Sequence, residues 1–188
     1  MKKTIVVIII VLVLTATILT LGACQNKVDD KTLVVDYLGK ATESTSATVK
    51  KTIEKDDVLL SESVIVYSKG QSDWTYTQTD KKLKEDPFAT EKYETTTSNG
   101  FIKNAPAFAI RANIIDRVIV KNETDKQEYD VFIKADELQS FMGLSDSEFA
   151  LVSNFELEVD VVNGRAVELD MSYDYDGTEV SLEIKYTY

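Results

Sequence analysis

Apolar and charged residues alternate along the last part of the chain, from Phe155 to Tyr188. A period of two residues is typical of a strand with one buried and one exposed face. The alternation is interrupted by Asn163-Gly164 and by Asp176-Gly177, two pairs that favour the type I′ turn of a tight hairpin. The segment therefore predicts a three-stranded antiparallel meander.

The alternation also assigns the residues of this meander to two faces. Leu169 and Leu182 are expected to face inward from adjacent strands, and their neighbours Glu168 and Glu183 to face outward. Because the apolar face has to be removed from water, the rest of the chain must cover it or shape it into a cavity.

The first half of the chain predicts one helix followed by strands. Residues 30–41 place Val34, Tyr37, Leu38 and Ala41 at helical intervals, with Asp30 as a plausible N-cap. Strands are expected over 44–55, over 58–68 and around Trp74 and Tyr76, followed by a charged loop over 80–92. Tight turns between these runs indicate a second antiparallel meander.

The segment between the two meanders predicts a mixture of elements. We expect, in order, a hairpin of residues 93–98 and 101–103 around Asn99-Gly100, a helix from Pro106 to residue 119, a strand over 129–135 and short helices over 136–142 and 145–152. Residues 118–120 fit the end of the helix and an extended segment equally well.

An apolar run near the N-terminus leads to the only cysteine of the chain. Lys2 and Lys3 precede aliphatic residues and threonines, and Leu21-Gly22-Ala23-Cys24 follows. This pattern resembles the lipobox of bacterial lipoproteins, in which diacylglycerol is attached to the thiol and cleavage makes the cysteine the mature N-terminus. The alternative is an uncleaved transmembrane anchor, because residues 4–23 are long enough to span a bilayer. Under either interpretation the body lies at the cell membrane, outside the cytoplasm.

The composition limits the partners of the body. Removal of residues 1–23 removes two lysines and changes the formal net charge from −11 to −13. Because a body with this negative charge lacks the cations that neutralise phosphates, we expect no nucleic acid partner. Attachment to an anionic membrane must then come from the diacylglycerol. The remaining chain of about 165 residues suits one domain, and a single cysteine excludes an intrachain disulfide.

Two residue types on which common catalytic sites depend, histidine and a free cysteine, are not available. The sequence contains no histidine, which removes the commonest general base and transition-metal ligand. Cys24 is assigned to the anchor, so no thiol nucleophile or zinc cluster remains. Asp174, Asp176 and Glu179 surround Gly177, but their spacing does not match a calcium-binding EF-hand loop. The sequence therefore predicts a protein that is not an enzyme and that uses neither a metal nor a cofactor.

The order of the expected elements resembles that of the LolA/LppX-type lipoprotein half-barrel superfamily: a helix, meandering strands, a helical interruption and a closing acidic meander with Asn-Gly and Asp-Gly turns. The resemblance implies an α+β fold in which an antiparallel sheet curves into an incomplete barrel packed on a few helices. It implies a signal peptide over 1–23, a short tether over 24–30 and one half-barrel domain over 31–188. Since members of that superfamily hold lipids or lipoprotein acyl chains between sheet and helices, it also implies a lipid-like hydrophobic ligand.

Inward-facing and aromatic residues are the candidates for lining such a cavity: Trp74, Val159, Leu169, Val180 and Leu182. Aromatic residues on strand faces suit a surface that is partly apolar and partly wet, but ordinary core and edge packing is the explanation that we favour. An open apolar cavity would favour the binding or carriage of a lipid. A filled core with a flat aromatic patch would favour the alternative, a non-enzymatic protein-interaction module of the cell envelope, such as an assembly factor or an inhibitor.

Overall fold

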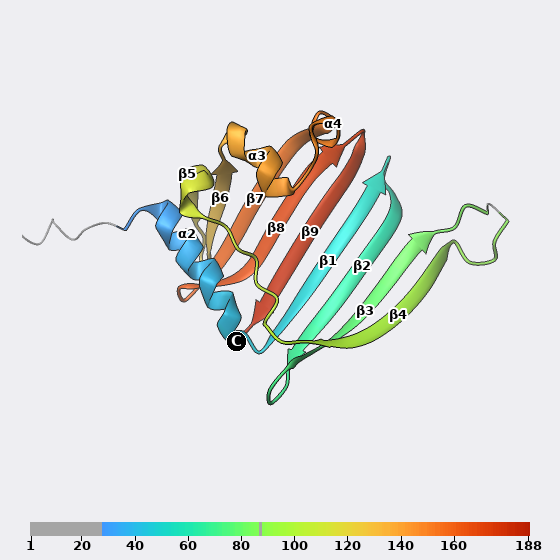
Figure 1. The fold of residues 1–188 in the computed structure, drawn as a ribbon, viewed down its shortest axis with the longest axis horizontal. Coiled ribbons are helices and arrows are strands. Elements are labelled where there is room, and N and C mark those ends of the chain that lie inside the picture. The colour runs from blue at the N-terminus through green and yellow to red at the C-terminus, as the bar shows by residue number, and fades with distance from the viewer. Residues whose placement is uncertain (1–27, 87) are drawn as a thin grey trace, which may run out of the picture.

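The computed structural model of the protein describes residues 28–86 and 88–188. Nine antiparallel strands form one open, curved sheet in the order β4-β3-β2-β1-β9-β8-β7-β6-β5 (Figure 1). The strands are β1 (Ser46–Lys55), β2 (Val58–Lys69), β3 (Trp74–Leu83), β4 (Tyr93–Ile102), β5 (Ile115–Asn122), β6 (Gln127–Ile133), β7 (Val152–Val162), β8 (Arg165–Tyr175) and β9 (Thr178–Thr187). The helical elements are α2 (Asp30–Gly39), η1 (Lys40–Glu43), η2 (Ala112–Ile114), α3 (Ala135–Met142) and α4 (Asp146–Phe149). An α+β fold dominated by antiparallel sheet is thereby confirmed.

The predicted signal peptide and the lipobox cysteine Cys24 lie outside the described residues. Over residues 28–86 and 88–188, no helix has the length and apolarity needed to cross a membrane.

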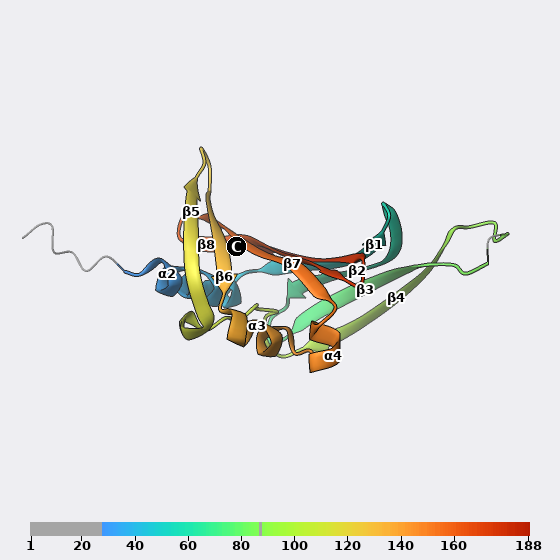
Figure 2. The same cartoon turned by 90° about the horizontal axis from the view of Figure 1, so that it is seen from above.

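The helices α2, α3 and α4 lie on one face of the sheet, which we call the inner face (Figure 2). They cover the half formed by β5 to β9, whereas β1 to β4 extend beyond them (Figure 1). The opposite face, which we call the outer face, has no helix against it in the described part of the chain. One sheet therefore has a covered half and an open half.

The hydrophobic core lies between α2 and the closing strands. Val34 and Leu38 of α2 are 0% and 1% exposed, and they belong to one cluster with Val159 on β7 and Leu169 on β8. Their spacing of four residues places the two α2 side chains on the same helix face. Burial of such aliphatic side chains contributes roughly 1.5–3 kcal/mol each to stability.

The predicted turns and caps of the second half are confirmed. Asn163-Gly164 and Asp176-Gly177 have positive φ at both residues, as a type I′ turn requires. Gly143 ends α3 in the left-handed conformation with φ of 68°, and Ser145 forms the capping box with Glu148 at the start of α4. Only the end of this last helix differs, because it stops at Phe149 and β7 begins at Val152.

The predicted hairpin at Asn99-Gly100 is wrong, because β4 runs through both residues and pairs with β3 along its whole length. Gly100 lies opposite Tyr76, and a Cβ atom there would come within 2.5 Å of the tyrosine ring. The glycine thus makes room for a cross-strand aromatic side chain. The predicted loop over 80–92 is also shorter, since β3 continues to Leu83.

The predicted helix from Pro106 to residue 119 is wrong as well. Residues 103–111 form an extended connection that crosses the inner face from β4, at one edge of the sheet, to β5, at the other (Figure 1). Extended chain advances about 3.3 Å per residue against 1.5 Å in a helix, so a helix of this length could not span the sheet. The extended alternative for residues 118–120 is confirmed, since they lie in β5.

Candidate functional site

The side chains of the inner face form rows that run from β8 across β9, β1 and β2 to β3. The strand register defines three of them: Leu169–Ile184–Val49–Ile65–Gln78, Met171–Leu182–Lys51–Ser63–Asp80 and Tyr173–Val180–Ile53–Ser61–Lys82. Every row is apolar on β8 and β9 and polar on β3. The inner face therefore changes from apolar to polar in the direction away from the helices.

Four of the five residues predicted to line a cavity lie close together on the closing strands. Val159 and Leu169 face each other across β7 and β8, are 0% exposed and fill the core beneath α2. Val180 is 8% exposed and Leu182 is half-buried, and both lie on β9 farther from α2. Trp74 is separate, because β3 lies three strands from β9, although it faces the same side of the sheet and is buried.

A small apolar pocket lies on the inner face at β8, beside the rows that contain Met171 and Tyr173. Its volume is about 220 Å³, and its lining comes from the crossing connection, α3 and β8: Phe108, Ala109, Phe141, Met142, Met171 and Tyr173. The rings of Phe108 and Phe141 pack edge to face with centroids 5.9 Å apart, and the Phe108 N–H donates to the Tyr186 hydroxyl. Pockets for small ligands usually measure about 300–1,000 Å³. This pocket therefore has room for only part of such a ligand.

Sequence reasoning missed the lining residues on the crossing connection and on α3. The spacing of Phe108 predicts a helix, whereas the residue lies in an extended connection, so the sequence carries no signal for its position beside β8. Met171 and Tyr173 could have been found, because they continue the inward alternation of Leu169 along β8.

The far end of the rows is a shallow polar groove between β1, β2 and β3. Its volume is about 300 Å³, and Lys51, Ser63, Asp80 and Lys82 contribute to it. In the described part of the chain neither Lys51 nor Lys82 forms an ion pair. The lysines of the groove lining, Lys51, Lys81 and Lys82, outnumber its two carboxylates, Glu62 and Asp80, so this end of the inner face is weakly basic.

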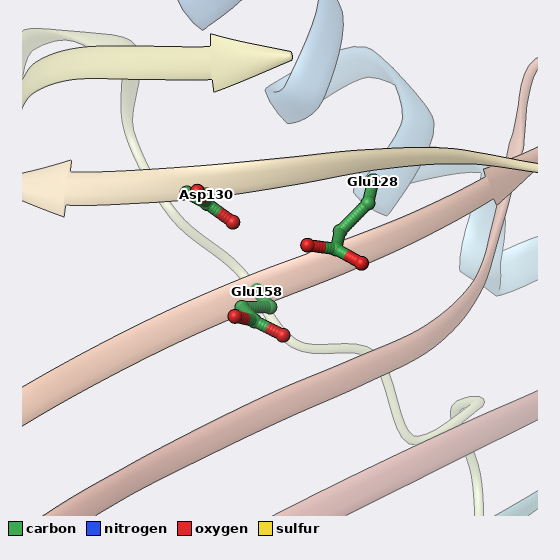
Figure 3. A group of neighbouring side chains, drawn as sticks. All are labelled: Glu128, Asp130 and Glu158. Atoms are coloured by element: carbon green, nitrogen blue, oxygen red, sulfur yellow. The ribbon is translucent and has the colours of Figure 1, made fainter. Parts of the chain in front are cut away.

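The outer face carries two groups of three carboxylates. Glu128 and Asp130 on β6 point toward Glu158 on β7 (Figure 3); the second group consists of Glu168, Asp170 and Glu183 on β8 and β9. In each group the carboxylate oxygens lie within 4.8 Å of one another. Such oxygens are the ligands that hard cations such as Ca²⁺ prefer.

Lysines already neutralise part of both groups. The Lys121 ammonium lies 2.7 Å from Glu128 and 3.0 Å from Asp130, and it lowers the pKa of Glu128 by hydrogen bonding. Lys185 contacts Glu168 at 3.1 Å in the second group. Partial burial, together with the neighbouring Glu168 and Glu183, raises the pKa of Asp170 to about 6. Partly exposed carboxylates bridged by lysines have the character of a solvated acidic face.

The weak resemblance of Asp174, Asp176 and Glu179 to a calcium loop has a structural explanation. Asp176 and Gly177 form the β8–β9 hairpin turn, and the Asp174 carboxylate accepts a hydrogen bond from the Asn154 side-chain amide. Asp174 and Asp176 therefore serve the neighbouring strand and the turn, respectively.

No protein-family profile and no curated protein matches this chain. Among solved structures, the crystal structure of an N-terminal dehydratase from the difficidin assembly line aligns over 85% of both chains with 9% identity and a TM-score of 0.19. A similarity at that level carries no argument about fold or function.

Proposed function

We propose that the protein is a lipid-anchored, non-enzymatic binding protein on the extracytoplasmic face of a bacterial cell membrane, with a half-barrel fold of the LolA/LppX type. Its ligand is an amphiphile with a lipid-like apolar part and an acidic headgroup. The apolar part lies on the inner face of the sheet, between α3 and the open half, and the headgroup lies toward β3.

The observation that supports this proposal most is the gradient along the inner-face rows. Leu182 pairs with Met171, which lines the apolar pocket, and with Lys51, which lines the polar groove. A ligand whose apolar end enters the pocket beside Phe141 would cover Leu182 and present its other end to Lys51 and Lys82. The pocket is too small for a whole lipid, so the rest of the ligand would lie on the open half of the inner face.

The predicted anchor would hold this face near a membrane. Cys24 precedes the start of α2 at Asp30 by six positions in the sequence, which correspond to roughly 20 Å of extended chain. A diacylglycerol on Cys24 would therefore hold α2 and the inner face within reach of the lipid surface. Such a position suits a protein that takes a lipid from that surface or delivers one to it.

The test is native mass spectrometry of residues 25–188, which include every contact of the fold described above. After exposure to a membrane lipid extract, the wild-type body is expected to retain an amphiphile. Leu182→Trp is expected to expel it without loss of thermal stability, because Leu182 is half-buried at the edge of the core. Val66→Trp, at a 43% exposed position of the outer face, is the matched control and is expected to retain the ligand.

The proposal fails if the wild-type body retains no amphiphile. It also fails if Leu182→Trp costs about 1–3 kcal/mol, the usual cost of overpacking a closed core. A protein-interaction module of the envelope would then be the better function. That alternative already has one observation in its favour, since the core beneath α2 is filled by its own side chains, Val34, Leu38, Val159 and Leu169.

A further inference from the structure

The pairing between β6 and β7 stops before either strand ends. The ladder joins Gln127–Asp130 to Val161–Glu158, which is four residue pairs. Beyond it β6 continues to Ile133 and β7 extends back to Val152, but the two strands no longer pair. A cleft of about 500 Å³ lies between them. This volume is within the range of about 300–1,000 Å³ typical of ligand sites.

Local features of β7 account for the separation. The register between β7 and β8 shifts between Ser153 and Glu156, and Asn154 has a φ of 52°. An irregularity of this kind bends a strand and increases its twist. β7 thus stays paired with β8 while it turns away from β6, and main-chain groups of Phe132 and its neighbours face the cleft with no strand opposite them in the described part of the chain.

The cleft is apolar at its inner side and charged at its outer side. Leu138 of α3, together with Phe155 and Leu157 of β7, contributes the apolar part. Asp130, Glu156 and Glu158 contribute carboxylates on the outer face. A ligand in the cleft would therefore meet apolar surface with one side and negative charge with the other.

The charges of the two strands are not equally balanced. Lys121 pairs with Glu128 and Asp130, so it neutralises the β6 side of the cleft. Over residues 28–86 and 88–188, neither Glu156 nor Glu158 forms an ion pair. Burial and the nearby carboxylates of Glu128 and Asp130 raise the pKa of Glu158. The β7 side of the cleft is thus complementary to a positive charge.

We propose that this cleft is a docking site for an extended peptide segment of another protein that carries a basic side chain. The peptide backbone takes the ladder positions that β6 and β7 leave open, as in recognition by strand addition. An apolar side chain of the peptide packs on Leu138 and Phe155, and its lysine or arginine contacts Glu156 and Glu158. The carboxylates of this site lie on the outer face, whereas the proposed lipid lies on the inner face.

The test uses the full chain in a non-ionic detergent and an array of pentapeptides built from Lys, Glu, Val, Phe and Ser. Peptides that alternate apolar residues with lysine are expected to bind, and the Kd of the best one is measured by fluorescence polarisation. Glu158→Gln is expected to weaken its binding by about tenfold, equivalent to about 1.4 kcal/mol. Glu168→Gln, which removes an outer-face carboxylate on β8 outside the cleft lining, is the matched control and is expected to leave the Kd unchanged.

Two further measurements separate strand addition from simple charge attraction. Methylation of the backbone amides of the best peptide is expected to abolish binding, because it removes the donors of the ladder. Leu138→Trp, which fills the cleft from α3, is expected to have the same effect. The proposal is overturned if no lysine peptide binds more tightly than about 1 mM, if glutamate peptides bind equally well, or if Glu168→Gln weakens binding as much as Glu158→Gln. It is also overturned if hexylamine binds as tightly as the best peptide.

Discussion

Replacement of Leu169 by alanine tests the assignment of the inner face most sharply. Leu169 is 0% exposed, and it lies between Val159 on β7 and Ile184 on β9 within the cluster that α2 covers. The change removes three carbon atoms, which at about 0.8 kcal/mol each corresponds to roughly 2.4 kcal/mol. The cavity left beneath α2 adds to this value, so the expected loss is about 3–4 kcal/mol, inside the range of about 2–5 kcal/mol for buried leucines.

Leu182 provides a comparison on the same face. It is half-buried, so Leu182→Ala is expected to cost only about 1–2 kcal/mol. Glu168 and Glu183 face the other side, where the Glu168–Lys185 ion pair is partly exposed. Their replacement by alanine is expected to change stability by less than about 1 kcal/mol.

Urea unfolding followed by far-ultraviolet circular dichroism measures these differences as shifts of the midpoint at constant slope. The order of destabilisation is expected to be Leu169, then Leu182, then the two glutamates. If either glutamate variant were less stable than Leu169→Ala, the register would be displaced by one residue, which would exchange the two faces of the closing strands.

Three further changes test other parts of the structure. Gly100→Ala is expected to destabilise the protein by about 1–3 kcal/mol through contact with the Tyr76 ring. In a double-mutant cycle, Tyr76→Ala should remove this cost, and a cost that stays unchanged would refute the contact as its cause. At pH values above 6, Asp170→Asn is expected to raise the urea concentration at the unfolding midpoint. Burial raises the pKa of Asp170 to about 6, so the charged form of this residue opposes folding. This gain should decrease as the pH falls toward the ordinary pKa of 3.8, whereas a gain that grows on acidification would contradict the assignment. Cys24→Ser is expected to abolish labelling by a fatty-acid analogue, and equal labelling of the serine variant would disprove the lipobox.

The closing meander could be predicted in detail because its signals are local. The alternation along β7 to β9 and the turn pairs Asn163-Gly164 and Asp176-Gly177 depend only on neighbouring residues and on the strand period. The inward positions of Leu169 and Leu182 followed directly from that period.

The crossing connection and β4 could not be predicted, because their conformations depend on residues far away in the sequence. Gly100 resembles a turn residue, but its partner is Tyr76 on the neighbouring strand. Phe108 fits a helical spacing, but its N–H bonds the Tyr186 hydroxyl at the other end of the chain. The pocket beside Phe108 could therefore not be predicted from the sequence. The inward positions of Val180 and Leu182, which pair with the pocket residues Tyr173 and Met171, could be predicted.

The cleft between β6 and β7 had even less signal in the sequence. Apolar and polar residues alternate along both strands, and this pattern does not indicate that the pairing stops at Asp130 and Glu158. The sequence predicted acidic residues on an exposed face, but it could not distinguish Asp130, which Lys121 neutralises, from Glu158, which has no such partner in the described part of the chain.

Photo-crosslinking tests the proposed ligand site most directly. A fatty acid with a diazirine at the end of its chain is bound to the body, irradiated, and its attachment sites are mapped by peptide mass spectrometry. Attachment is expected on the peptides that contain Phe141, Met171 and Leu182, and Leu182→Trp should remove it. Attachment confined to outer-face positions such as Val66, or none above the level of a heat-denatured sample, would contradict the binding of a lipid on the inner face.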